Sequence, residues 1–175
     1  MLCMFAFPGS AASEAGFRIL DASSRLSDGV HRVDLSVDFD FSEAAIEAMR
    51  NGVAITVSVR MQVLRVRALL DETIAEVRAR YRIQAHSLSR RFRVTNLSTD
   101  ERMTFLTYEA MKRGLGSITN FPLLDDRILR AGERYRVRAR ATLDIESLPA
   151  PMRPLAYLSS SWRLSSDWTS WPLQR

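Results

Sequence analysis

Apolar and polar residues alternate along several stretches of the chain, most regularly from residue 134 to residue 145. The odd positions of this stretch are apolar or small: Tyr135, Val137, Ala139, Ala141, Leu143 and Ile145. The even positions are polar, and four of them are arginines: Arg134, Arg136, Arg138 and Arg140. A repeat of two residues is typical of a β-strand with one buried and one solvated face. A slip of one residue would bury the arginines, so the pattern predicts a firmly fixed register.

The same alternation predicts further strands over residues 17–22, 33–41, 53–63, 72–84, 91–95 and 103–105. One of them repeats the arginine pattern on its polar side, at Arg78, Arg80 and Arg82. The alternation changes phase at Leu64, which indicates a bulge or the end of a strand, and Ile74 breaks the pattern of the following strand.

Short helices and turns separate these strands. Ser42 and Thr107 are good N-caps, and they precede short helices predicted over 43–50 and 108–113. Residues 121–124 are expected to be a loop at the edge of the core, and the proline-rich segment 147–154 an extended or turn segment. About seven strands with two short helical insertions predict a mainly β protein, an antiparallel β-sandwich of immunoglobulin-like or similar architecture.

The first residues differ from the rest of the chain. A short apolar core at residues 2–7 is followed by Pro8-Gly9 and the small-x-small pattern Ser10-Ala11-Ala12, which is typical of the end of an export signal. No basic residue precedes the apolar core, so the alternative is a terminus that packs Phe5 and Phe7 on the body. We therefore expect a residual signal peptide or disordered leader over 1–15 and a single domain over 16–175. This places the protein in the periplasm, or in the cytoplasm if the leader is not a signal.

The formal charge of +5 comes mainly from arginine. Arginine binds carboxylate and phosphate groups through two parallel hydrogen bonds, so the two arginine-bearing strands are a candidate face for an anion or a partner. The candidate residues are Arg78, Arg80, Arg82, Arg134, Arg136, Arg138 and Arg140. The alternative is cross-strand pairing with the carboxylates of Asp34, Asp38, Asp40, Glu72, Glu76 and Asp144.

Nucleic acid is a poor candidate ligand. The aromatic residues on these two strands, Tyr81 and Tyr135, fall on the apolar side, where they cannot stack with bases beside the arginines. The tryptophans gather near the end of the chain, at Trp162, Trp168 and Trp171. They are expected to close an open end of the sandwich, and the alternative is an exposed aromatic contact cluster.

The chain shows no grouping of residues that is typical of a catalytic or metal site. His31 and His86 are far apart in sequence, and neither has a partner at metal-ligand spacing. A triad of Ser89, His86 and an aspartate can be written, but no nucleophile-elbow glycines surround the serine. The single cysteine, Cys3, excludes a disulfide within the chain. We expect no enzyme activity, no metal and no cofactor. The sequence also contains no apolar run of the roughly 20 residues that a transmembrane helix needs.

Taken together, the segments of the chain resemble a proteobacterial family of domains of unknown function, family 4390. The matching segments, in order, are VDFDF (37–41), NGV (51–53), RYRIQAHSLSRRFRV (80–94), LRAGERY (129–135), LDIESLP (143–149) and WRLSSDW (162–168). The chain departs from the resemblance between residues 65 and 73, where aromatic residues are expected before the return strand. That departure puts a binding role for this hairpin in doubt.

The resemblance implies an exported bacterial protein with no established activity, encoded near a membrane sensor kinase of the nitrogen-regulation type. Two hypotheses follow. The first is a non-enzymatic periplasmic interaction or accessory module, whose partner is the sensor kinase or another envelope protein. The second is a binder of anionic lipid or polysaccharide through the arginine-rich face.

Overall fold

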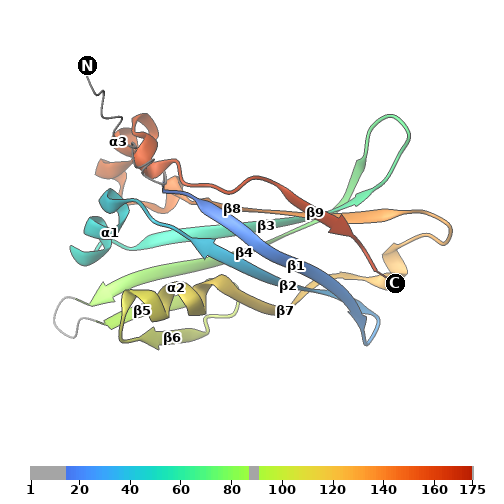
Figure 1. The fold of residues 1–175 in the computed structure, drawn as a ribbon, viewed down its shortest axis with the longest axis horizontal. Helices are drawn as coiled ribbons and strands as arrows, with labels where there is room; N and C mark the ends of the chain where they lie inside the picture. The colour runs from blue at the N-terminus through green and yellow to red at the C-terminus, as the bar shows by residue number, and fades with distance from the viewer. Residues whose placement is uncertain (1–14, 87–90, 175) are drawn as a thin grey trace, which may run out of the picture.

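Two antiparallel sheets make up the structure, a computed structural model that describes residues 15–86 and 91–174 (Figure 1). The three-stranded sheet has the order β1-β2-β7, with β1 at Phe17–Ser27, β2 at Val30–Phe39 and β7 at Ser117–Asp125. The six-stranded sheet has the order β6-β5-β4-β3-β8-β9. Its strands are β3 (Ile55–Arg65), β4 (Glu72–His86), β5 (Arg91–Asn96), β6 (Arg102–Phe105), β8 (Tyr135–Leu143) and β9 (Thr169–Pro172).

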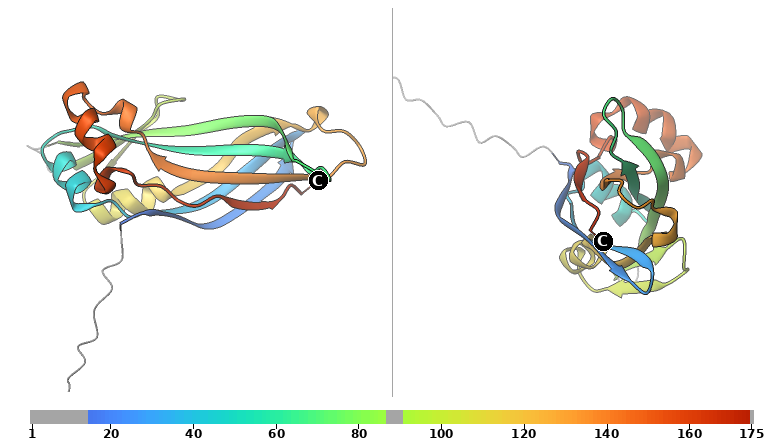
Figure 2. Two further views of the ribbon diagram at one scale, coloured as in Figure 1. Left: turned by 90° about the horizontal axis from the view of Figure 1, so that it is seen from above. Right: turned by 90° about the vertical axis from the view of Figure 1, so that its right-hand side faces the viewer.

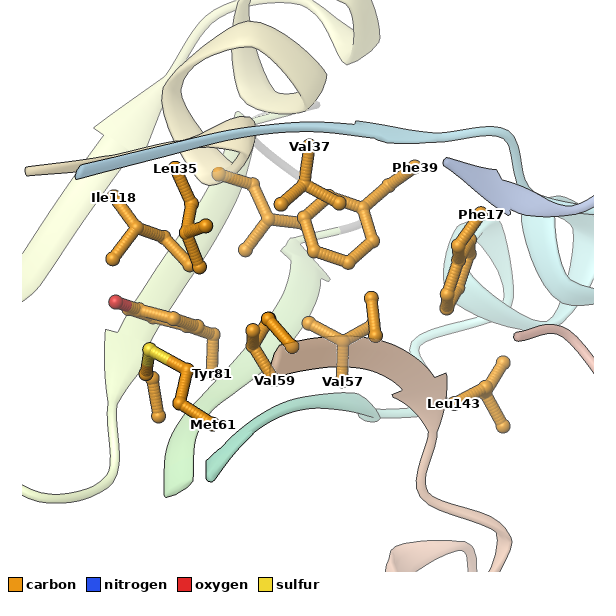
Figure 3. Packing of buried hydrophobic residues seen from close by; sticks show 14 of the residues in the cluster. Phe17, Leu35, Val37, Phe39, Val57, Val59, Met61, Tyr81, Ile118 and Leu143 are labelled. Atoms are coloured by element: carbon orange, nitrogen blue, oxygen red, sulfur yellow. The ribbon is translucent and has the colours of Figure 1, made fainter. Parts of the chain in front are cut away.

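The apolar rows of the two sheets face each other and form a shared core (Figure 3). Leu35, Val37 and Phe39 project from β2 toward Val57, Val59 and Met61 of β3. Burial of one such side chain contributes roughly 1.5–3 kcal/mol, whereas an exposed ion pair contributes about 0–1 kcal/mol. The apolar rows therefore determine which face of each strand points inward. The prediction of a mainly β, two-layered antiparallel protein is confirmed.

The irregularity predicted near Leu64 is a bulge in the β3–β4 hairpin. Val63 lies opposite Ala75 and Leu64 lies opposite Thr73, so Ile74 is an extra residue in β4. The insertion explains why Ile74 breaks the alternation of its strand.

Both predicted helices are present and begin at the expected caps. The Ser42 Oγ accepts a hydrogen bond from the Ala45 N–H at the start of α1 (Glu43–Arg50). The Thr107 Oγ1 accepts one from the Ala110 N–H at the start of α2, which runs over Tyr108–Gly116. Helix α2 packs on β2, while α1 and α3 lie at one end of the long axis of the sandwich (Figure 2).

The structure corrects the strand count from about seven to nine, because two segments form strands that the pattern did not predict. Residues 121–124 are not a loop but part of β7, where Pro122 is tolerated because β7 is an edge strand bonded only to β2. Strand β9 pairs with β8 near the C-terminus. Strand β1 also continues to Ser27, five residues beyond its predicted end at residue 22.

The proline-rich segment is another correction. It passes through the 3₁₀ helix η3 (Ala150–Met152), and its last two residues begin the helix α3 (Arg153–Leu158). Pro154 lies in the first turn of α3, where a proline needs no hydrogen-bond partner for its nitrogen. The predicted leader falls almost wholly on residues 1–14, which lie outside the described ranges. None of the helices in the described ranges combines the length and apolar character that crossing a bilayer requires.

Candidate functional site

The outer surface of the six-stranded sheet carries the predicted arginines side by side. We call this surface the outer arginine face and define it by Arg60 of β3, Arg78, Arg80 and Arg82 of β4, and Arg136, Arg138 and Arg140 of β8. Arg134, the remaining predicted residue, precedes β8 and is exposed. Strand β3 lies between β4 and β8, so the arginine patterns of β4 and β8 flank a central strand instead of touching each other.

One row across these strands brings three arginines directly opposite one another. Arg60 lies opposite Arg78 on one side and opposite Arg140 on the other. Like charges at directly opposed positions destabilise a sheet. Repulsion within this row therefore lowers the stability of the sheet, and the packing of the core does not require arginines at these positions.

Several arginines of the face are partly neutralised. Arg78 donates to Glu76 at 2.7 Å, Arg80 donates to Asp144 at 2.9 Å, and Arg136 pairs with Asp71. Arg138 donates to the Gln62 Oε1 at 2.7 Å, and its guanidinium lies 4.6 Å from the centre of the Trp168 ring. Arg140 is held by the Ser166 carbonyl and the Ser165 hydroxyl, which carry no charge.

Other arginines have no partner among the described residues. The side chains of Arg82 and Arg134 make no hydrogen bond or ion pair there, and the same holds for the side chains of Arg91 and Arg93 on the neighbouring strand β5. Arg91 lies opposite His86 and Arg93 lies opposite Gln84, so both continue the outer surface beyond Arg82. Glu76, Asp144 and Asp71 thus pair with arginines in the middle of the face, Glu76 from the same strand as Arg78, and leave its β4–β5 side positive.

Glu76 is the carboxylate that lies beside Arg60 and Arg78 of the arginine row. Its Oε2 accepts from the Gln62 amide at 2.6 Å, and its Oε1 accepts from Arg78. The hydrogen bond from Gln62, followed by those from Arg78, holds the pKa of Glu76 below its ordinary value, and the charge of Arg60 adds to the effect. Glu76 is therefore ionised at neutral pH and is shared between two arginines.

A pocket of 530 Å³ opens on this face beside the 3₁₀ helix η2 (Ile145–Ser147) and helix α3. Its polar lining comes from both sheet and helix: Ser58, Arg60, Arg78, Arg80, Thr142, Asp144, Glu146 and Tyr157. A volume of this size is in the ordinary range of about 300–1,000 Å³ for small-molecule sites. The arrangement offers arginine and hydroxyl donors to an anionic group beside two carboxylates that already have partners.

The family model described as "Domain of unknown function (DUF4390)" matches residues 14–172. The chain belongs to the DUF4390 family. The matched range begins just before β1 and ends with β9, so it includes every strand of both sheets. No curated protein and no solved structure matches the chain.

The tryptophans of this DUF4390 chain lie in three different settings. Trp162 is buried at the end of the 3₁₀ helix η4 (Ser160–Trp162), and Trp171 of β9 packs against the edge of the core. Trp168 is 37% exposed and lies on the outer arginine face beside Arg138. No ring contact joins any two of them in the part of the chain that the structure describes. Of the predicted cluster, Trp168 is the member that the structure places at the candidate site.

The histidines lie on different sheets of the DUF4390 fold. His31 of β2 is fully buried, and its Nε2 lies 2.9 Å from the Asp126 Oδ1. His86 is the last residue of β4 on the six-stranded sheet, and Ser89 lies outside the described residues. Within the described ranges, no group of three or more His, Cys, Asp or Glu residues is arranged to hold a metal ion.

The hairpin in which the DUF4390 resemblance fails is exposed at its tip. Leu69 is 98% exposed and Leu70 is 82% exposed, between the ends of β3 and β4. These leucines stand where the resemblance leads us to expect aromatic residues.

The site also includes residues that the sequence reasoning did not single out. Arg60 lies on the polar side of a predicted strand, but its importance depends on the order of the strands in the sheet. Tyr157 belongs to α3, a helix that the sequence pattern did not predict. Arg91 and Arg93 were assigned to a strand, and the alternation alone could not place that strand beside Arg82.

Proposed function

We propose that this DUF4390 protein is a non-enzymatic interaction module of the bacterial cell envelope that binds its partner through the outer arginine face. The observation that carries the proposal is the row of Arg78, Arg60 and Arg140, which are directly opposed across three strands. Such a row costs stability in the free protein. A partner that brings negative charge to the row would remove that cost on binding.

The partner that best fits the family context is an envelope protein, and our candidate is the extracytoplasmic part of a membrane sensor kinase. The export signal predicted from residues 1–15 supports a periplasmic site of action. An acidic surface on the partner would be drawn to the positive β4–β5 side of the face, since opposed charges speed association and fix orientation.

Crosslinking in intact cells, followed by purification of the tagged protein from the envelope, tests this proposal. We expect a crosslinked envelope protein that is lost when Arg82 and Arg93 are both changed to Glu. Arg102→Glu is the matched control, because Arg102 is exposed on β6 but already pairs with Asp100 at 2.9 Å. Recovery of no envelope partner, or equal loss in the control, would count against the proposal.

The second candidate is binding to anionic lipid or polysaccharide by the same face. Hydroxyl groups beside the arginines favour it, because Ser58 and Thr142 line the same pocket as Arg60. Vesicles that contain phosphatidylglycerol should bind at low salt and release the protein as salt rises, since screening weakens interactions between exposed charges. The absence of binding at low salt would end this alternative.

A further inference from the structure

Arg60 is the unusual residue of the pocket. It lies on the central strand β3 between two other arginines, and it makes no hydrogen bond with any described residue. Its one carboxylate neighbour is Glu76, with the Arg60 Nε and the Glu76 Oε1 3.7 Å apart. That distance is too long for a hydrogen bond, and Glu76 already accepts from Gln62 and Arg78. The guanidinium donors of Arg60 are therefore unused in the structure.

The lining of the pocket carries one more positive than negative charge. It contains three arginines, Arg60, Arg78 and Arg80, and two carboxylates, Asp144 and Glu146. Each carboxylate already has its own partners. Asp144 accepts from Arg80 and the Ser147 hydroxyl, and Glu146 accepts from the Tyr157 hydroxyl and pairs with Arg153. Arg78 donates to Glu76 and Arg80 donates to Asp144, so Arg60 is the arginine of the lining whose guanidinium is left to receive an anion.

We propose that this pocket binds a phosphomonoester carried on a hydroxyl-bearing small molecule, such as a sugar phosphate or a phosphorylated headgroup. The forked donors of Arg60 suit the oxygens of a phosphate, which accepts two parallel hydrogen bonds from one guanidinium. Ser58 and Thr142 line the same pocket and present hydroxyls to the rest of the ligand. The inference rests on the outer arginine face being the binding surface, and it names the chemical group that the face recognises.

Isothermal titration with glucose 1-phosphate, glucose and glucuronate tests the assignment on the full chain. We expect saturable binding of glucose 1-phosphate, with glucose and glucuronate at least tenfold weaker, because each lacks the dianionic group. The change Arg60→Gln should lower the affinity for glucose 1-phosphate roughly tenfold or more, since a hydrogen bond to a charged group is lost. Arg60→Lys keeps the positive charge but cannot donate two parallel hydrogen bonds. Its affinity for glucose 1-phosphate should lie between those of the wild type and Arg60→Gln.

Two variants serve as controls for folding and for general charge. Arg50→Gln removes an exposed arginine at the end of α1, and Arg102→Gln removes an exposed arginine on β6. Both should keep the affinity for glucose 1-phosphate within about twofold, as surface changes that touch no site usually have small effects. Equal weakening in Arg60→Gln and Arg50→Gln would overturn the proposal, and so would glucuronate binding as tightly as glucose 1-phosphate.

A vesicle measurement separates a membrane source of the ligand from a soluble one. Phosphatidic acid presents a phosphomonoester in its headgroup, whereas phosphatidylglycerol presents a phosphodiester at the same place in its headgroup. Binding to phosphatidic acid that exceeds binding to phosphatidylglycerol and depends on Arg60 would assign the ligand to a lipid headgroup. If neither glucose 1-phosphate nor phosphatidic acid binds in an Arg60-dependent way, the inference is wrong. The crosslinked partner sensitive to Arg82 and Arg93 would still stand as the proposed function in that case.

Discussion

Gly116 lies where the end of α2 meets the backbone of β2, and no side chain fits there. A Cβ atom at this position would lie 2.1 Å from the carbonyl oxygen of Val37. Because the obstacle is backbone, it cannot rotate away. We expect Gly116→Ala to lower the free energy of unfolding by about 1–3 kcal/mol or more, the usual cost of forcing atoms into a packed site. Urea unfolding followed by circular dichroism measures the change.

Gly52 provides the comparison for this prediction. Its φ of +83° strains any other residue, but a Cβ atom there would meet nothing within 4 Å. Gly52→Ala should therefore lower the free energy of unfolding by only about 1–2 kcal/mol, the cost of a left-handed backbone for a residue with a Cβ atom. If Gly116→Ala proved no more destabilising than Gly52→Ala, the close contact between α2 and β2 would be wrong.

Asp38 links stability to pH on the outside of the three-stranded sheet. Its Oδ2 accepts a hydrogen bond from Arg18 at 2.9 Å across the β1–β2 pair, and Lys112 lies 3.5 Å from its Oδ1. The hydrogen bond from Arg18 lowers the pKa of Asp38 from 3.8, although partial burial acts in the opposite direction. A carboxyl whose pKa is lower in the folded state stabilises the fold above its unfolded pKa and loses that contribution as pH falls.

We therefore expect the unfolding free energy of the wild type to fall more steeply than that of Asp38→Asn as the pH drops from about 5 toward 2. The two proteins should differ most at neutral pH and converge in acid. Asp21→Asn is the control, since Asp21 is exposed on β1 and makes no ion pair with a described residue. Urea unfolding at a series of pH values gives the curves, and a constant difference between wild type and Asp38→Asn would contradict the linkage.

At the scale of elements, β7 contributes to the core although its sequence does not show a regular strand. Leu123 is 4% exposed and packs in the core cluster. Leu123→Ala should cost about 2–5 kcal/mol, as expected for a leucine removed from a packed interior. Leu158→Ala on α3, where the side chain is 83% exposed, should change stability by less than about 0.5 kcal/mol. Equal small effects at both positions would mean that residues 121–124 behave as a loop.

The elements that the alternation predicted are those whose two faces differ in polarity. In β2, β4 and β8 the side chains alternate between buried and more exposed positions, whereas in β3 the outward positions are mostly polar but, apart from the exposed Arg60, buried or half-buried. Strand β7 does not, because its pairing with β2 shifts register twice and contains Pro122. Asn120, with a φ of +56°, adds another break. A bulged edge strand leaves no simple period for sequence reasoning to find.

The sequence predicted only part of the candidate site, for a related reason. The arginine patterns of β4 and β8 follow from local alternation, and so does the polar position of Arg60. Their meeting depends on β8 pairing with β3, a contact between strands far apart in the sequence. One chain does not reveal which distant strands pair, so the opposed row of arginines required the structure.

At the scale of the whole molecule, one core joins the two sheets, and residues 16–175 are predicted to be one domain. Phe39 of β2 and Val57 of β3 belong to the same buried cluster and are both fully buried. Neither sheet can expose its inner face without leaving the other uncovered. We therefore expect the two sheets to unfold together in a single cooperative transition.

Two probes on different sheets test this cooperativity. Tryptophan fluorescence reports on the six-stranded side through Trp168 and Trp171 and on the buried Trp162 of η4, and amide hydrogen exchange reports on β2 in the three-stranded sheet. Their urea midpoints should coincide, and Leu123→Ala should shift both by the same amount even though it alters only β7. Loss of protection in β1, β2 and β7 before the fluorescence change would show that the three-stranded sheet opens separately. The sandwich would then be two units, and binding at the outer arginine face could proceed without the three-stranded sheet in place.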